Sequence, residues 1–219
     1  MSEAYTPTSR TQLRRRPARG VYDKARVHAI LDEAFICHVG FVVDGQPYVM
    51  PTAYARIEDQ VYVHGAAAGR FAAALGSGLD ICLTVTLVDG LVLARSAFHH
   101  SINYRSVVAL GRARVVTDPD EKRRAMASLT NHVVPDRWDE VRQPDEKELG
   151  TTTVLALALE EVSAKVRVGP PIDDEEDYAW PVWAGVVPIQ MSAGAPVPDA
   201  RVQPNLVFRT DRLQKRSAP

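Results

Sequence analysis

The chain has 219 residues, 46% of them hydrophobic and 24% charged, which is typical of a folded protein and excludes a fibrous or largely disordered chain. Its 26 basic and 27 acidic residues nearly cancel, so no overall field would hold it on nucleic acid or on an anionic membrane. No run of about 18 apolar residues occurs, and Pro17 follows the arginines at 14–16 where an export signal needs an apolar run. We therefore expect a cytoplasmic protein without a membrane or nucleic-acid partner.

The first predicted elements are an N-terminal strap and a helix. Residues 1–20 are polar, rich in arginine and without periodicity, which is typical of a strap outside the main domain. Asp23 is a good N-cap for a helix that continues to Ala34, because apolar residues then recur on one helix face. After this helix, turn signals separate three strands and a short helix, predicted at 36–43, 48–57, 61–64 and 69–75.

The chain then continues with strands that one longer helix interrupts. Asp89-Gly90 predicts a tight turn between two strands, and Asp118-Pro119 predicts the start of a helix that runs to about Asn131. The strands of this part are predicted at 79–87, 91–95, 104–116, 152–159 and 160–168.

These elements predict one mainly β domain with flanking segments. Antiparallel strands with helices inserted between hairpins favour a small barrel of the α+β class, which we place at 21–188. The acidic run at 173–177 is typical of a solvated loop. Several prolines fall within 189–219, which predicts an extended C-terminal tail.

The first candidate site follows the third strand. Val63 and His64 end the strand, small residues follow, and a helix then begins beside Arg70. Free N–H groups at a helix start and an arginine fork are suited to holding a phosphate. The same pattern is typical of a tight strand–helix turn with a solvent-facing arginine, so both interpretations stay open.

A second candidate lies at 95–106, where polar and aromatic side chains are unusually dense. In an extended chain His99 and His100 face opposite ways, so we expect no metal ion held by both. No metal-ligand motif of the CxxC or HExxH type occurs elsewhere, and we predict no metal site. The alternative interpretation is a polar hairpin connection, with Tyr104 as a core aromatic.

Two weaker signals complete the candidates. Pro51, between Met50 and Thr52, lies within a strand pattern and indicates an edge or bulge whose free backbone groups suit a flat heteroaromatic ring. Trp180 and Trp183 would either cap an apolar pocket or fix the tail to the domain.

In this order the segments resemble the FMN-binding split-barrel family related to pyridoxamine 5′-phosphate oxidase, nearest its nitroimidazole-resistance branch. The resemblance extends over about residues 19–188 and is carried by the segments 19–23, 30–34, 45–52, 62–65, 99–108 and 183–188. It implies a six-stranded antiparallel split barrel that forms a homodimer, with two FMN sites at the interface. The C-terminal tryptophan and Arg-Leu segment of the oxidase itself lacks a full match here, so we do not expect the vitamin-forming reaction.

The resemblance also implies roles for individual residues. Cofactor binding is implied for Met50, Pro51 and Thr52 at the isoalloxazine edge, Val63 and His64 beside the ribityl chain, Arg70 at the phosphate, Ser101, Asn103 and Arg105 completing the site, and Trp183 over the ring. His100 and Tyr104 would face the substrate as catalytic groups.

Two classes of function follow from this interpretation. The first is an FMN-dependent oxidoreductase that acts on a small molecule, whether nitro-aromatic, quinone-like or pyridoxal-like. The alternative is a non-catalytic protein of the same fold that binds a flavin, a deazaflavin or haem, in which His64, His99 or His100 would be the axial ligand of the haem.

Overall fold

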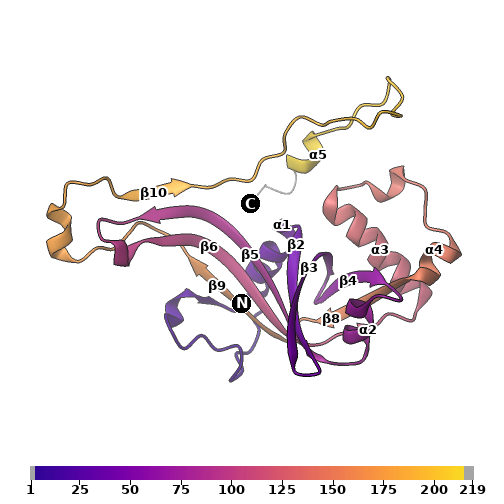
Figure 1. The fold of residues 1–219 in the computed structure, drawn as a ribbon, viewed down its shortest axis with the longest axis horizontal. Coiled ribbons are helices and arrows are strands. Elements are labelled where there is room, and N and C mark those ends of the chain that lie inside the picture. Colours follow the sequence, from indigo (N-terminus) through magenta and orange to yellow (C-terminus); the bar gives the residue numbers. More distant parts are fainter. Residues whose placement is uncertain (1–2, 215–219) are drawn as a thin grey trace.

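The computed structural model describes residues 3–214, and its main feature is a strongly curved antiparallel sheet (Figure 1). The strands run in the order β1-β9-β6-β5-β2-β3-β4-β8-β7, and β10 pairs with β5 beside this path. This arrangement confirms the predicted split-barrel class, although the sheet has ten strands instead of six. Three of the ten strands, β1, β7 and β10, have only two to four residues, which is too short for periodicity in the sequence to reveal.

The strands and helices have the following bounds. The strands are β1 Gly20–Val21, β2 Ile36–Val43, β3 Gln46–Ile57, β4 Gln60–Ala66, β5 Asp80–Leu93, β6 Ser101–Arg112, β7 Arg114–Val115, β8 Thr152–Ala158, β9 Glu161–Arg167 and β10 Gly185–Pro188. The α-helices are α1 Lys24–Glu33, α2 Arg70–Gly76, α3 Pro119–Val133, α4 Glu146–Thr151 and α5 Asp211–Gln214. Short 3₁₀ turns are η1 Pro17–Arg19, η2 Ala97–His99, η3 Trp138–Glu140 and η4 Glu175–Ala179. Among the described residues, no helix is long and apolar enough to cross a membrane.

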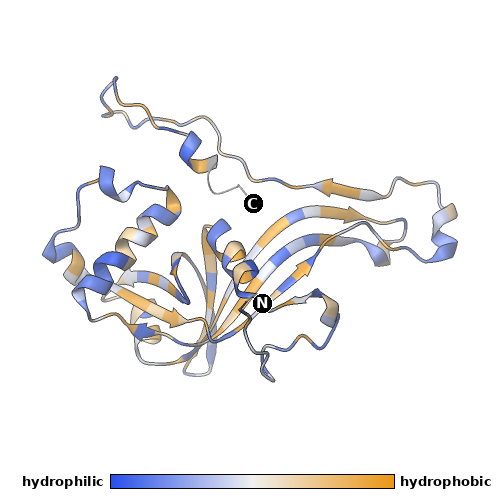
Figure 2. Cartoon of the chain, turned by 180° about the vertical axis from the view of Figure 1, so that it is seen from behind, coloured by the Kyte–Doolittle hydropathy of each residue, from blue (hydrophilic) through white to orange (hydrophobic). Residues whose placement is uncertain are grey.

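Alternating side chains build the core of the barrel. In β2, Cys37, Val39 and Phe41 are buried, whereas Ile36 and His38 lie on the outer face and are exposed. The same alternation is visible along the long strands as bands of apolar and polar residues (Figure 2). Because neighbouring residues of a strand point to opposite faces, this pattern fixes which face of each strand is buried.

The barrel closes at one place and is split at another. Closure brings β6 against β8 at Gly111, where a Cβ atom would lie 3.0 Å from Leu157 Cδ1. The split begins where the ladder between β3 and β4 ends, at the pair Tyr54–Val63. From there β3 continues only with β2 and β4 continues with β8, so within the described chain residues 46–53 have no strand partner on the edge that faces β4.

The hairpin of β5 and β6 extends far beyond the barrel (Figure 1). The predicted turn at Asp89-Gly90 is wrong, because β5 passes through this dipeptide with a bulge and pairs with β6 up to Val92. The glycine is required by a close approach, since a Cβ on Gly90 would lie 3.0 Å from Val186 Cγ1 of β10. The chain reverses instead at 94–100, the hairpin tip, which contains η2.

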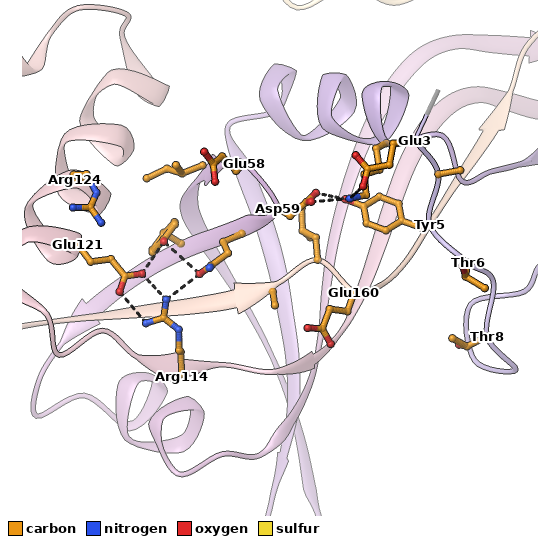
Figure 3. Close-up of a pocket in the computed structure, with 17 residues that line it drawn as sticks. Glu3, Tyr5, Thr6, Thr8, Glu58, Asp59, Arg114, Glu121, Arg124 and Glu160 are labelled. Atoms are coloured by element: carbon orange, nitrogen blue, oxygen red, sulfur yellow. Dashed lines mark hydrogen bonds and ion pairs between the residues drawn. The ribbon is translucent and has the colours of Figure 1, made fainter. Parts of the chain in front are cut away.

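The N-terminal segment is fixed to the barrel through the turn between β3 and β4. Asp59 in this turn accepts hydrogen bonds from Lys24 Nζ at 2.7 Å and from the buried Tyr5 hydroxyl at 3.2 Å, and it lies 3.1 Å from His28 Nε2. Figure 3 shows Tyr5 and Asp59 on one side of a cavity of about 990 Å³. The hydrogen bond from Lys24 holds the pKa of Asp59 below its ordinary value.

We predict that Asp59→Asn destabilises the protein at neutral pH but not in acid. The carboxylate has a lower pKa in the folded than in the unfolded chain, so its contribution is complete above the unfolded value and is lost as the pH falls below about 4. Thermal unfolding from pH 3 to pH 7 should show a lower Tm for the variant at pH 7 and a gap that closes towards pH 3. Glu58→Gln, which changes the adjacent exposed carboxylate, is the control. An equal gap at both ends of the range would contradict the prediction.

Candidate functional site

One group of candidate residues gathers at the split of the barrel. Met50, Pro51 and Thr52 lie on the unpaired edge of β3, and Val63 and His64 lie on β4 where the two strands separate. The structure therefore brings these candidates together. Backbone groups without a strand partner are available to a ligand, because unpaired N–H and C=O groups retain their hydrogen-bonding capacity.

Arg70 stands beside this split at the start of α2. Its guanidinium lies 5.7 Å from the centre of the Tyr48 ring on β3, so the arginine reaches across from the β4 side. Within the described residues it has no ion-pair partner, and its side chain is exposed. A Cβ on the preceding Gly69 would lie 3.0 Å from the carbonyl oxygen of Ala66, so the chain needs glycine for this tight entry into the helix. Arg70 is thus a cation without an anion at the edge of the split.

His64 is the titratable group of the split. Desolvation by the surrounding protein lowers its pKa, which favours the neutral imidazole at pH 7. No hydrogen bond occupies its ring nitrogens in the described part of the chain, so the ring is available as an acceptor or donor.

A second group of candidates lies at the hairpin tip. His100 is exposed, and its Nδ1 atom lies 2.9 Å from the carbonyl oxygen of Ser96. Since only a protonated Nδ1 can donate to a carbonyl, this contact places the lone pair of the neutral ring on Nε2. His99 is held differently, with Nε2 at 3.2 Å from Asp174, and Asp177 lies close to the same atoms.

Asp173 holds the tip in shape. Its carboxylate is buried and accepts hydrogen bonds from the backbone N–H groups of Arg95 (2.9 Å) and Ser96 (3.4 Å). Burial raises the pKa of this carboxyl, but these bonds and the Arg95 guanidinium outweigh the burial and lower it overall. Because Ser96 also supplies the carbonyl that contacts His100, Asp173 fixes the frame that orients the histidine. The sequence predicts only a solvated acidic loop at Asp173, because the hydrogen-bond partners of Asp173 lie 77 and 78 residues away.

Large aromatic side chains surround the tip without being buried. Phe98 is 88% exposed and Trp180 is 67% exposed, and Trp183 is exposed as well. The Tyr178 ring lies 4.8 Å from the Arg95 guanidinium, which places η4 and the segment after it beside the tip. Exposed apolar surface of this density is typical of a site that a ligand or a second chain covers.

A groove of about 490 Å³ runs along the outer face of the hairpin. It is lined by Thr86, Val88, Ser101, Ile102, Tyr104 and Ser106. Asn103 lies beside it but is buried, and its amide donates to the carbonyl of Gly169 at 3.1 Å. The larger cavity of Figure 3 contains none of the predicted site residues, so its size does not identify it as the candidate site.

Arg105 does not join either group. Each of its three nitrogen atoms donates to a carboxylate, with Glu33 of α1 and Asp89 of β5 as acceptors. These hydrogen bonds raise the pKa of the guanidinium further. A guanidinium that two carboxylates already neutralise is poorly suited to a phosphate, so the prediction that Arg105 binds the cofactor is corrected to a structural ion-pair network.

The two groups lie far apart within one chain. Pro51 is in register with His38, Thr84 and Val108 across β3, β2, β5 and β6. His100 lies eight residues from Val108, or about 27 Å along an extended strand. Within one chain the split and the hairpin tip therefore hold two separate groups of candidate residues.

The chain matches one family model and is similar to several solved structures. The family model described as pyridoxamine 5′-phosphate oxidase matches residues 23–166. The flavocytochrome Anf3 of Azotobacter vinelandii is similar at 44% identity and a TM-score of 0.88, over 96% of this chain and 98% of that chain. An FAD and haem binding protein of Mycobacterium smegmatis has 35% identity and a TM-score of 0.83, over 87% and 94% of the two chains.

A more distant structure shares the fold. A Bacteroides thetaiotaomicron protein assigned to 5-nitroimidazole antibiotic resistance has 24% identity and a TM-score of 0.57, over 67% of this chain and 86% of that chain. No curated protein is significantly similar to the chain.

Proposed function

The chain belongs to the pyridoxamine 5′-phosphate oxidase family, and from this premise we propose that it is an oxidoreductase that binds both a flavin and a haem. The two relatives above 30% identity support the pairing, since one is a flavocytochrome and the other binds FAD and haem. A bound flavin would supply hydride or electron-pair chemistry and a bound haem one-electron chemistry. The protein would supply position, charge and a barrier to water.

The observation that carries the proposal is the geometry of His100. Histidines that bind metal ions commonly donate their other ring N–H to a backbone carbonyl or carboxylate, which fixes both the ring orientation and the tautomer. His100 has this arrangement through Ser96, and its Nε2 atom has no hydrogen-bond partner in the described chain. The exposed rings of Phe98, Trp180 and Trp183 suit a flat apolar macrocycle. The tip therefore fits a haem, with His100 as axial ligand.

The split of the barrel fits a flavin. The unpaired edge of β3 at Met50–Thr52 offers backbone donors and acceptors to the ring, and Arg70 offers a charge to a phosphate. His64, held neutral, would stand beside the chain that joins ring and phosphate. We assign FAD in place of the FMN that the resemblance implies, because the Mycobacterium smegmatis relative binds FAD.

A homodimer would join the two groups of residues. The split and the hairpin tip are separated by about 27 Å along the strand within one chain, so a second copy could bring its tip to the split of the first. Exposed apolar side chains such as Ile36, Val49 (65% exposed) and Val88 lie on the outer face of the sheet and support such an association. Tyr104 would then face a small-molecule substrate, quinone-like or nitro-aromatic, across the interface, while His100 serves the haem.

The proposal is tested by an absorbance spectrum of the purified protein between 300 and 700 nm. We expect a Soret band together with flavin bands, and we expect reduction to bleach the flavin bands and shift the Soret band. Chromatography of the extracted flavin against FAD and FMN standards identifies the nucleotide, and light scattering gives the number of chains. A protein that retains neither flavin nor haem when both are added would contradict the proposal.

A further inference from the structure

Arg167 at the end of β9 is a buried cation whose partners are all neutral. Arg167 is 7% exposed. Its guanidinium donates to the amide oxygen of Asn103 and to the carbonyls of Gly169 (3.2 Å) and Pro170 (3.3 Å). Its Nε atom is buried and has no acceptor among residues 3–214. Arginine stays protonated in proteins, so a full positive charge lies in the interior without a carboxylate.

A second arginine makes this arrangement less favourable still. Arg19 precedes Gly20, which pairs with Lys165 two residues before Arg167, and its charge adds to the effect of burial in lowering the pKa of Arg167. Neither guanidinium forms an ion pair with a carboxylate in the part of the chain that the structure describes. Buried charges are normally paired, because the interior does not replace the water that solvates an unpaired charge. Two neighbouring arginines without an acid therefore indicate that an anion belongs between them.

The position of Arg167 relates it to the hairpin groove. Arg167 is directly opposite Tyr104 in the ladder between β9 and β6, and Asn103 is the residue before Tyr104 on β6. Tyr104 lines the groove, and Asn103 hydrogen-bonds directly to Arg167. From Asn103 to His100 is three residues, or about 10 Å in extended chain. An anion at Arg167 would thus lie one short strand segment from the histidine of the tip.

We infer that Arg167 and Arg19 bind a carboxylate of the haem, the propionate side of the macrocycle, while His100 binds its iron. This rests on the proposed function, because it takes His100 as the axial ligand. A porphyrin carries its two carboxylates on one edge. The distance from the iron to these carboxylates is of the same order as the distance from His100 to Asn103. The flavin phosphate is the other anion to consider, but it is already assigned to Arg70 at the split.

The first test uses the wild-type protein with haem b and with haem dimethyl ester, in which both carboxylates are neutral. We expect titrations followed at the Soret band to show about 10- to 100-fold tighter binding of haem b, the range for hydrogen bonds to a charged group. Equal affinities would overturn the inference and leave the proposed function intact. Absence of binding by either compound would overturn both.

The second test uses variants of the two arginines. Arg19→Gln and Arg167→Gln should each weaken the binding of haem b about tenfold or more and leave that of the dimethyl ester unchanged. Arg19 is only half-buried, so its variant answers the question even where Arg167→Gln fails to fold. Arg26→Gln is the matched control, since Arg26 on α1 is exposed. Loss of flavin with unchanged haem binding in the Arg19 and Arg167 variants would assign the pair to a phosphate and overturn the inference.

Discussion

Replacing His100 with alanine is expected to abolish the Soret band of the purified protein while the flavin bands remain. The imidazole of His100 combines a fixed tautomer with an unoccupied Nε2, because Nδ1 contacts the Ser96 carbonyl at 2.9 Å. Without it the macrocycle would keep only contacts with exposed apolar rings and the contact of its carboxylate with Arg19 and Arg167. We expect haem content, measured by the pyridine haemochrome assay, to fall at least tenfold.

The matched controls are other histidines of the same chain. His38 on β2 is exposed and lies on the outer face of the sheet, away from the tip. His99 is the neighbour of His100, but Asp174 occupies its Nε2 atom. We expect His38→Ala and His99→Ala to retain the Soret band. An unchanged band in His100→Ala, or its loss in His38→Ala, would rule out the assignment of the axial ligand.

Local patterns predicted the elements of this fold well where one segment alone decides the outcome. The predicted N-caps Asp23 and Asp118 both accept backbone hydrogen bonds at their helix starts, because a cap depends on residues two or three positions away. The predicted β2 strand has the observed bounds, since its alternation separates a buried from an exposed face. The turn predicted at Asp89-Gly90 does not form, because pairing with β6 and the approach of β10 outweigh a local turn signal.

Roles of charged residues depended on partners that are distant in the sequence. Arg105 and Arg167 lie on the adjacent strands β6 and β9, and only Arg105 belongs to a conspicuous motif. Yet Arg105 is neutralised by Glu33, 72 residues away, whereas Arg167 receives only neutral acceptors. Which arginine lacks an anion is therefore a property of the folded chain. No spacing in the sequence could have distinguished the two.

The assignment of the flavin to the split leads to the last prediction, that Arg70→Ala lowers the affinity for the flavin about 10- to 100-fold. Charge-assisted hydrogen bonds to phosphate are the strongest polar contacts that this split offers, and Arg70 is the cation at its edge. Because the side chain is exposed, we expect the Tm to change little, apart from the weak contact with the Tyr48 ring.

The measurement is fluorescence titration of the flavin-depleted protein with FAD, in wild type, Arg70→Ala, Arg70→Lys and Arg26→Ala. Lysine keeps the charge but loses the planar fork, so Arg70→Lys should lie between wild type and alanine. Arg26→Ala removes one exposed arginine elsewhere and should bind as wild type does. The Soret band should be equal in all four proteins, because the flavin is assigned to the split and the haem to the hairpin tip. Equal FAD affinity in Arg70→Ala and wild type would place the phosphate elsewhere, and a weaker Soret band in Arg70→Ala would show that the two sites are not independent.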